Sequence, residues 1–157
     1  GVTVIAHGLE HLGDGRSCVL VANHVSWFDI PALGAVLPRM NFVAKAELRR
    51  IPVFGLAAER SGQIFIEREQ RKAAFAAYQR AAERIRDGAT VIVFPEGTRG
   101  NSYALRPFKK GPFVLAIAAG VPVIPVYIHG SLDVQPKGAW TLRPGTIHLH
   151  FLPPIAT

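Results

Sequence analysis

Cysteine is nearly absent from this chain, which contains only Cys18. A lone cysteine cannot form an internal disulfide, so nothing in the sequence indicates an oxidising compartment. Residues 1–15 also lack the basic stretch followed by an apolar stretch that marks a signal peptide. Residues 111–128 carry no charged side chain, but Pro112, Gly120, Pro122 and Pro125 interrupt them. A spanning helix needs about 20 continuous apolar residues, so we expect a buried helix and strand there and no membrane span in this chain.

Several familiar catalytic and ligand-binding motifs are missing as well. The sequence has no G-x-S-x-G elbow for a nucleophilic serine, no G-x-x-x-x-G-K-[ST] phosphate loop and no G-x-G-x-x-G dinucleotide loop. Its six histidines do not stand with cysteine or glutamate at zinc-site spacing, and His148 and His150 alternate as neighbours on one face of a predicted strand. The sequence therefore implies no metal and no bound cofactor.

The composition is that of a folded globular protein with a basic surface. Of 157 residues, 49% are hydrophobic and 18% are charged, so we expect residues 1–157 to form one domain, cut at both ends. Lysine and arginine total 18 against 11 acidic residues, a net charge of +7. This excess favours anionic partners, namely nucleic acid, anionic lipid headgroups or phosphorylated small molecules, and does not select among them.

Hydrophobic patterning predicts strands that alternate with helices. We expect strands at residues 2–6, 18–22, 41–44, 63–66, 90–94, 123–129 and 146–152. We expect helices at residues 30–37, 47–58 with an interruption near Pro52, 69–87 and 113–119, and Asp29 is expected to cap the first of them. The predicted fold class is α/β, a single layer-type domain with a central, largely buried mixed β-sheet flanked by helices. A site is expected in the loops that follow the strands.

The apolar run 18–22 leads directly into a histidine and an aspartate. His24 and Asp29 are five positions apart, and a chain turn between them lets the carboxylate orient one imidazole nitrogen while the other faces a substrate. This spacing predicts a general base and its orienting group. The alternative is that His24 is an ordinary loop histidine and Asp29 only caps a helix.

Basic residues follow three further predicted strands. The strand 90–94 leads into Glu96, Gly97, Thr98 and Arg99, where glycine permits close backbone approach and arginine offers a planar fork for phosphate. Strand 63–66 leads likewise into Glu67 and Arg68, and Lys45 ends the strand 41–44. The alternatives are a polar turn after a core strand, an Arg68 that caps or solvates the next helix, and a solvated Lys45.

Taken together, four sequence blocks resemble the glycerolipid acyltransferases, specifically the 1-acyl-sn-glycerol-3-phosphate acyltransferases. They are N-H-x4-D at 23–29, G-x-I-F-I-[DE]-R at 62–68, F-P-E-G-T-R at 94–99 and V-P-[VI]-[IV]-P-V at 121–126. They occur in the family's order, within residues 17–130. Two departures are Glu67, where aspartate is common, and the lack of the apolar N-terminal segment usual in the family.

The resemblance implies a transfer of a fatty acyl group from acyl-CoA or acyl carrier protein to the sn-2 hydroxyl of 1-acyl-sn-glycerol-3-phosphate, giving phosphatidate. His24 would be the general base and Asp29 its orienting carboxylate, with direct attack on the thioester and no acyl-enzyme or cofactor. Other residues would bind the acceptor: the basic ones its phosphate, the glycine and threonine by shaping the site, and the glutamate by holding the loop or the glycerol backbone. They are Lys45, Arg68, Glu96, Gly97, Thr98 and Arg99.

The implied partners are a lysophospholipid acceptor, an acyl thioester donor and an anionic membrane surface, with the chain peripheral on the cytoplasmic face of the cell membrane. One alternative is a related acyltransferase for lyso-ornithine lipid, glycerol 3-phosphate or another lysophospholipid. The other is a non-enzymatic basic module that binds anionic membrane or nucleic acid. We expect no nucleic-acid partner, because the arginines lie at separate strand ends without an aromatic-rich platform.

Overall fold

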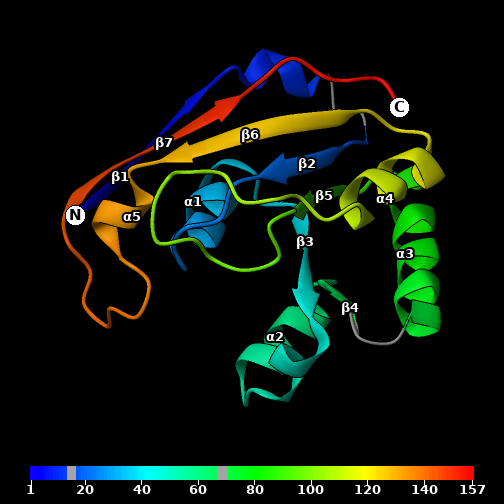
Figure 1. Ribbon diagram of the computed structural model, residues 1–157, viewed down its shortest axis with the longest axis horizontal. Coiled ribbons are helices and arrows are strands. Elements are labelled where there is room, and N and C mark those ends of the chain that lie inside the picture. The colour runs from blue at the N-terminus through cyan, green and yellow to red at the C-terminus, as the bar shows by residue number, and fades with distance from the viewer. Residues whose placement is uncertain (14–16, 67–70) are drawn as a thin grey trace.

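The centre of the molecule is a seven-stranded mixed sheet (Figure 1). The computed structural model describes residues 1–13, 17–66 and 71–157, and for residues 71–75 it describes the backbone alone. The strands are β1 (Val2–His7), β2 (Val19–Ala22), β3 (Met40–Lys45), β4 (Ile64–Ile66), β5 (Thr90–Val93), β6 (Val123–His129) and β7 (Gly145–Phe151). Their order is β1-β7-β6-β2-β5-β3-β4, and β6 and β7 form the antiparallel pair. The other neighbours run parallel.

Helices cover both faces of this sheet. The α-helices are α1 (Asp29–Val36), α2 (Phe54–Arg60), α3 (Arg71–Arg86), α4 (Gly111–Ala119) and α5 (Ser131–Val134), and 3₁₀ helices span Leu9–Leu12 and Ala46–Arg50. Figure 1 shows α3 and α4 packed side by side at one end, while α2 projects away from the sheet beyond β3. The predicted fold class is thus confirmed.

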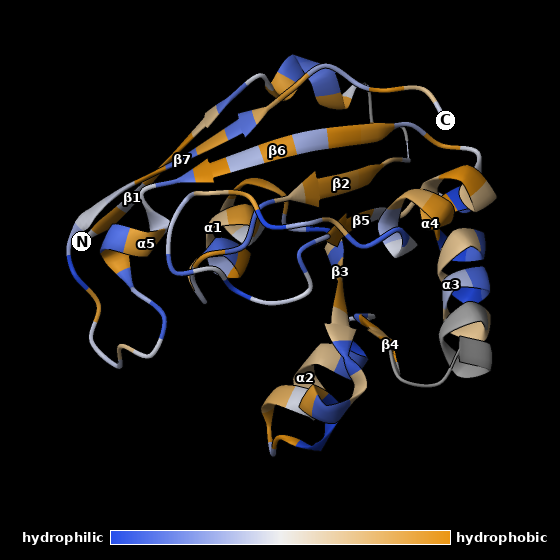
Figure 2. Ribbon diagram, viewed as in Figure 1, coloured by the Kyte–Doolittle hydropathy of each residue, from blue (hydrophilic) through white to orange (hydrophobic). Residues whose placement is uncertain are grey.

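The central strands are apolar on both faces because both faces are covered. In β2, Val19 and Val21 face a core formed with α3 and α4, whereas Leu20 and Ala22 face a second core formed with α1 and α5. Continuous apolar runs of this kind are typical of strands in a two-sided parallel sheet. Figure 2 shows hydrophobic colour along β2 and β5, on part of α1 and over most of α4.

The sheet half formed by β1, β7 and β6 is covered differently. Buried side chains of β6 and β7, such as Ile128 and Leu149, face the α1 side. Side chains that point to the other face of these strands, including His7, Tyr127 and His150, are exposed or half-buried. This half therefore alternates apolar and polar residues, the pattern of a sheet with one open face.

Within the described residues the sequence predicted most elements within one or two residues, and the predicted start of the helix 69–87 lies outside those residues. One local assignment was wrong. Helix α1 begins at Asp29, its N-cap is Phe28, and no side chain makes a capping hydrogen bond. The Asp29 carboxylate turns back to the N–H groups of Val25 and Ser26, which precede the helix. The predicted interruption near Pro52 is present between Ala46–Arg50 and α2. Within the described residues, no helix is both long and apolar enough to cross a membrane.

Candidate active site

The side chains predicted to act together lie at the carboxyl ends of parallel strands. His24 follows β2, Lys45 ends β3, and Gly97, Thr98 and Arg99 follow β5. All five line one cavity of about 270 Å³, whose remaining wall is largely apolar and aromatic. The other lining residues are Trp27, Ile30, Phe42, Val43, Ala44, Leu48, Phe54 and Phe94. Crevices at the carboxyl ends of strands are where open α/β sheets bind ligands, so the fold and the site agree.

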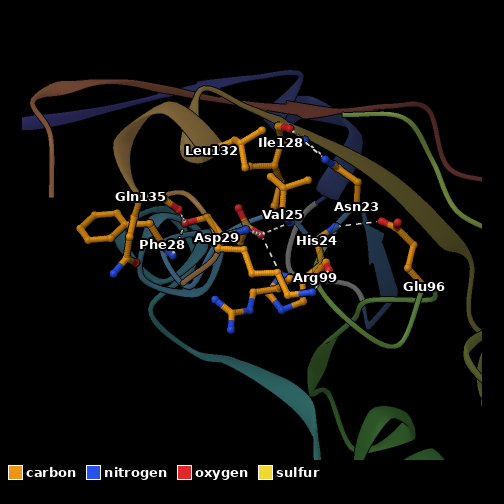
Figure 3. A network of polar contacts seen from close by, with 12 residues as sticks. Asn23, His24, Val25, Phe28, Asp29, Glu96, Arg99, Ile128, Leu132 and Gln135 are labelled. Carbon is orange, nitrogen blue, oxygen red and sulfur yellow. Dashed lines mark hydrogen bonds and ion pairs between the residues drawn. The ribbon is translucent and has the colours of Figure 1, made fainter. Parts of the chain in front are cut away.

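A buried carboxylate orients the histidine in this cavity. Asp29 Oδ2 lies 2.7 Å from His24 Nδ1 and accepts hydrogen bonds from the N–H groups of Val25 (2.8 Å) and Ser26 (2.9 Å) (Figure 3). Asp29 is fully buried and the His24 side chain is 15% exposed. With Nδ1 engaged by the carboxylate, Nε2 is the ring nitrogen left for a ligand in the cavity. This is the arrangement of a general base with an orienting carboxylate.

The backbone of His24 is fixed by the loop that follows β5. Its N–H group donates to Glu96 Oε1 (3.0 Å), and its carbonyl accepts from the N–H group of Gly100 (2.8 Å). Glu96 is buried, and its Oε2 accepts from the N–H group of Arg106 (3.2 Å). The imidazole stacks on Phe94 with ring centroids 4.0 Å apart. Glu96 therefore holds the loops together, which was one of the two roles expected of it.

The cationic side of the cavity is formed by Lys45 and Arg99. The Arg99 guanidinium lies over the Trp27 ring, 4.7 Å from its centroid, and the Arg99 carbonyl accepts from Lys137 Nζ (3.2 Å). Gly97 has φ 76°, a conformation that favours glycine, and lets the loop turn beside the cavity. Arg68, predicted to converge on the same anion, lies outside the described residues.

A comparison of sequences then places the chain among known proteins. The sequence model of the acyltransferase family matches residues 3–129. The chain belongs to the acyltransferase family. It is 37% identical over 133 residues to 1-acyl-sn-glycerol-3-phosphate acyltransferase BAT2 of Brassica napus, covering 84% of this chain and 39% of that protein. It is 44% identical over 116 residues to lyso-ornithine lipid O-acyltransferase of Pseudomonas aeruginosa, covering 74% of this chain and 44% of that protein.

A solved structure resembles almost the whole of this chain. The 1-acyl-sn-glycerophosphate (LPA) acyltransferase PlsC of Thermotoga maritima superposes with a TM-score of 0.84 at 36% identity. The match covers 99% of this chain and 62% of that one. The chain spans about half the length of the curated relatives that it matches.

Two residues of the candidate site were not predicted from the sequence. The Asn23 side chain pairs with the backbone of Ile128, donating from Nδ2 to its carbonyl (3.0 Å) and accepting at Oδ1 from its N–H group (2.7 Å). These two hydrogen bonds extend the contact between β2 and β6 past the end of β2, and so they fix the position of the neighbouring His24. The stacking of Phe94 on His24 was likewise missed. Both contacts join segments far apart in sequence, and only the position of Asn23 in the N-H-x4-D block hinted at its role.

A second cavity adjoins the first. It measures about 210 Å³ and shares Phe94 and Gly97 with the cavity that His24 lines. Ile66, Val93 and Pro112 contribute to its apolar wall. Of the side chains described, the three that could jointly ligate a metal ion lie in neither cavity.

Proposed function

We propose that this chain transfers a fatty acyl group from the thioester of acyl-CoA or acyl carrier protein to the sn-2 hydroxyl of 1-acyl-sn-glycerol-3-phosphate. The observation that carries the proposal is His24, oriented by a buried Asp29 at 2.7 Å and lining a cavity with Lys45 and Arg99. A base beside a cationic cavity suits an acceptor with a hydroxyl and a phosphate. The relatives named as 1-acyl-sn-glycerol-3-phosphate acyltransferases support the same acceptor.

In the proposed mechanism His24 Nε2 takes the proton of the acceptor hydroxyl. The hydroxyl oxygen attacks the thioester carbonyl carbon, and the tetrahedral intermediate collapses as the carbon–sulfur bond breaks. The departing sulfur then receives the proton from His24, so the ester and the free thiol are the two products. Asp29 holds Nδ1–H and stabilises the imidazolium that forms between the two proton transfers. No acyl-enzyme is required.

The acceptor phosphate is assigned to Lys45 and Arg99, together with Arg68 from the sequence blocks. A phosphate monoester accepts charge-assisted hydrogen bonds, which contribute roughly 1.5–3 kcal/mol each. A neutral acceptor leaves these cations without a partner, and a site built around a polar group rejects a ligand that lacks it. The second cavity, with its apolar wall, suits an acyl chain beside the base.

A second acceptor is favoured by one comparison, the 44% identity to a lyso-ornithine lipid O-acyltransferase. An ornithine headgroup offers a carboxylate to Lys45 and Arg99 in place of a phosphate. The chemistry at His24 is the same for both acceptors, so the preferred acceptor depends on how well its headgroup binds Lys45 and Arg99.

The deciding experiment measures thiol release from acyl-CoA with four acceptors, namely lysophosphatidate, lyso-ornithine lipid, lysophosphatidylcholine and monoacylglycerol. We expect lysophosphatidate to give the highest kcat/KM in the wild-type protein, and Arg99→Ala to lower that value about 10-fold or more. The same variant should change the slow use of monoacylglycerol much less. Preference for lyso-ornithine lipid in the wild-type protein would replace the phosphate assignment with the second acceptor. No thiol release with any acceptor would contradict the acyl transfer itself.

We infer further that the protein works at the cytoplasmic face of a membrane and that α2 with the preceding turn contacts anionic lipid. Ile51, Val53 and Leu56 are 44%, 83% and 53% exposed on this projecting segment. Arg50 and Arg60 lie beside them and are exposed. Figure 2 shows hydrophobic and hydrophilic colour close together on α2. Exposed apolar side chains flanked by cations fit a bilayer with anionic headgroups.

This segment also adjoins the cavity. Leu48 and Phe54, from the 3₁₀ helix and from α2, line the same cavity as His24. A lysolipid that leaves the bilayer at α2 therefore reaches the base without crossing bulk water. The net charge of +7 supports the same anionic surface. The absence of a nucleic-acid partner stays a prediction.

Co-sedimentation with vesicles tests this placement. We expect binding to vesicles with anionic lipid, weaker binding at high salt, and a clear loss with Leu56→Asp. The matched control is Ile117→Asp, because Ile117 is 64% exposed on α4, which lies apart from α2 (Figure 1). Equal losses in both variants would contradict a contact specific to α2.

A further inference from the structure

Four histidines gather on the open face of the sheet half formed by β1, β7 and β6. His7 ends β1, His148 and His150 alternate along β7, and His129 ends β6. The strand register pairs His7 with His150 and His129 with His148, so all four belong to adjacent positions. Burial, followed by the nearby His7, His148 and His129, lowers the pKa of His150. Neither the proposed acyl transfer nor the cavity uses these side chains.

Three of these imidazoles approach one another closely. His7 Nε2 lies 3.2 Å from His148 Nδ1, and the His7 and His150 rings are 4.5 Å apart between centroids. One ring nitrogen from each of His7, His148 and His150 can be chosen so that all three lie within 4.8 Å of one another. Two nitrogens bound to one tetrahedral zinc ion, each about 2.0–2.1 Å from it, lie about 3.3 Å apart. One edge of such a site is thus already at the required length.

We propose that His7, His148 and His150 bind a single Zn²⁺ ion, with water as its fourth ligand. Three imidazoles and one water make a tetrahedral set that zinc adopts in proteins. The site contains nitrogen ligands alone, which suit Zn²⁺ and its first-row neighbours, whereas Mg²⁺ and Ca²⁺ require oxygen. No carboxylate belongs to the described group.

Binding requires the rings to turn, and the backbone need not move. The His7 ring lies within 13° of parallel to His148 and within 9° of parallel to His150, so the in-plane lone pairs do not yet meet at one point. The χ2 torsion of histidine has a broad, shallow profile, and His7 is exposed, so this rotation is inexpensive. The backbone register already holds the three Cα atoms on neighbouring strands.

The ion would join the edge strand to the rest of the sheet. β1 is the outermost strand in the order, and its strand partner is β7. A metal ion that links His7 to His148 and His150 crosslinks this pair at the carboxyl end of β1. Because an ion that binds the folded state stabilises it, zinc should raise the unfolding temperature.

The test titrates Zn²⁺ into the purified, chelator-treated protein at pH 7.5, by calorimetry and by thermal unfolding, with Co²⁺ absorption as a probe of tetrahedral geometry. We expect one ion per chain, a higher Tm with Zn²⁺ and no change with Mg²⁺. His150→Gln and His7→Gln should each weaken binding at least 10-fold. His11→Gln, which removes a histidine outside the cluster, should bind like the wild type. His7 is exposed at a strand end, so its replacement leaves a folded protein in which the loss can be measured.

Several results would overturn the proposal. They are equal binding by wild type and both cluster variants, more than one equivalent ion per chain, or a Co²⁺ spectrum of octahedral form. A zinc-dependent dimer in light scattering, absent in His7→Gln, would show that the histidines bridge two copies and that the intrachain site is wrong. Acyl transfer measured in parallel keeps the two proposals separate. Lack of zinc binding leaves the role of His24 untouched, and inactive but zinc-binding protein contradicts the acyl transfer alone.

Discussion

Replacing Asp29 with asparagine tests how much the orientation of the general base matters, because the base itself, His24, stays in place. In the wild-type protein one carboxylate oxygen faces three nitrogen atoms, His24 Nδ1 and the backbone nitrogens of Val25 and Ser26. Asparagine keeps the shape but has no charge, so its amide oxygen in the place of Oδ2 accepts weaker hydrogen bonds from the same three groups. The proton on Nδ1 of the His24 ring is therefore held less firmly, and a smaller share of the protein has Nε2 free to accept the substrate proton.

The magnitudes follow from these contacts. A hydrogen bond to a charged group contributes about 1.5–3 kcal/mol and a neutral one about 1 kcal/mol, so three bonds lose together about 3 kcal/mol. The variant regains part of this stability, because it no longer has to bury a charged group away from water. We expect a free energy of unfolding lower by about 2 kcal/mol. General base catalysis contributes about 10²–10⁴ in rate, and the base itself remains. We therefore expect kcat to fall by about 10²-fold, less than after His24→Ala.

Three measurements check the reasoning on the same protein. Urea unfolding gives the stability loss, thiol release gives kcat and KM, and ¹⁵N shifts of the His24 ring show which nitrogen carries the proton. Glu96→Gln is the matched control, since it makes the same change at another buried carboxylate that holds backbone N–H groups but does not touch the ring. It should cost stability and leave the His24 tautomer as it is. A folded Asp29→Asn protein with the wild-type tautomer and near-normal kcat would refute the orienting role.

Further predictions concern other parts of the chain. His24→Ala should lower kcat by about 10²–10⁴ and change the free energy of unfolding by about 1 kcal/mol or less. Arg99→Lys should recover only part of the kcat/KM lost in Arg99→Ala, because a point charge cannot reproduce the guanidinium fork. Val53 has φ 64° and is 83% exposed, so Val53→Gly should raise stability by about 1 kcal/mol while it weakens vesicle binding. Burial raises the pKa of the Cys18 thiol to about 11, so at pH 8 it stays protonated and should react with Ellman's reagent only after unfolding.

Two kinds of local sequence pattern predicted parts of the fold and of the candidate site. Continuous apolar runs at residues 18–22 and 90–94 predicted buried central strands, because a strand covered on both faces needs no alternation. Polar groups just past those strands predicted the site, because parallel strands bring their carboxyl ends to one edge. His24 and Arg99 therefore line the same cavity, as the sequence blocks implied.

Pairings between distant segments could not be predicted in the same way. No local sequence pattern indicates that β1 pairs with β7. His7 and His150 are far apart in the chain and become neighbours only through this pairing. For the same reason the spacing of the histidines along the chain did not indicate that three of them lie together. Asp29 was predicted both as a helix cap and as the carboxylate that orients His24, because an aspartate at the start of a helix suits either role. Three-dimensional contacts, namely the N–H groups of Val25 and Ser26, distinguish the two roles.

The two hydrogen bonds to the His24 backbone, from its N–H group to Glu96 and from Gly100 to its carbonyl, also limit how this site can open. They join the loop after β2 to the loop after β5 as one mechanical unit. A hinge motion that moves Arg99 away must either carry the histidine with it or break both bonds. We therefore expect the His24 and Arg99 backbones to keep their separation when the cavity opens. Entry and exit are left to the lining residues outside these two loops, among them Leu48 of the 3₁₀ helix and Phe54 of α2.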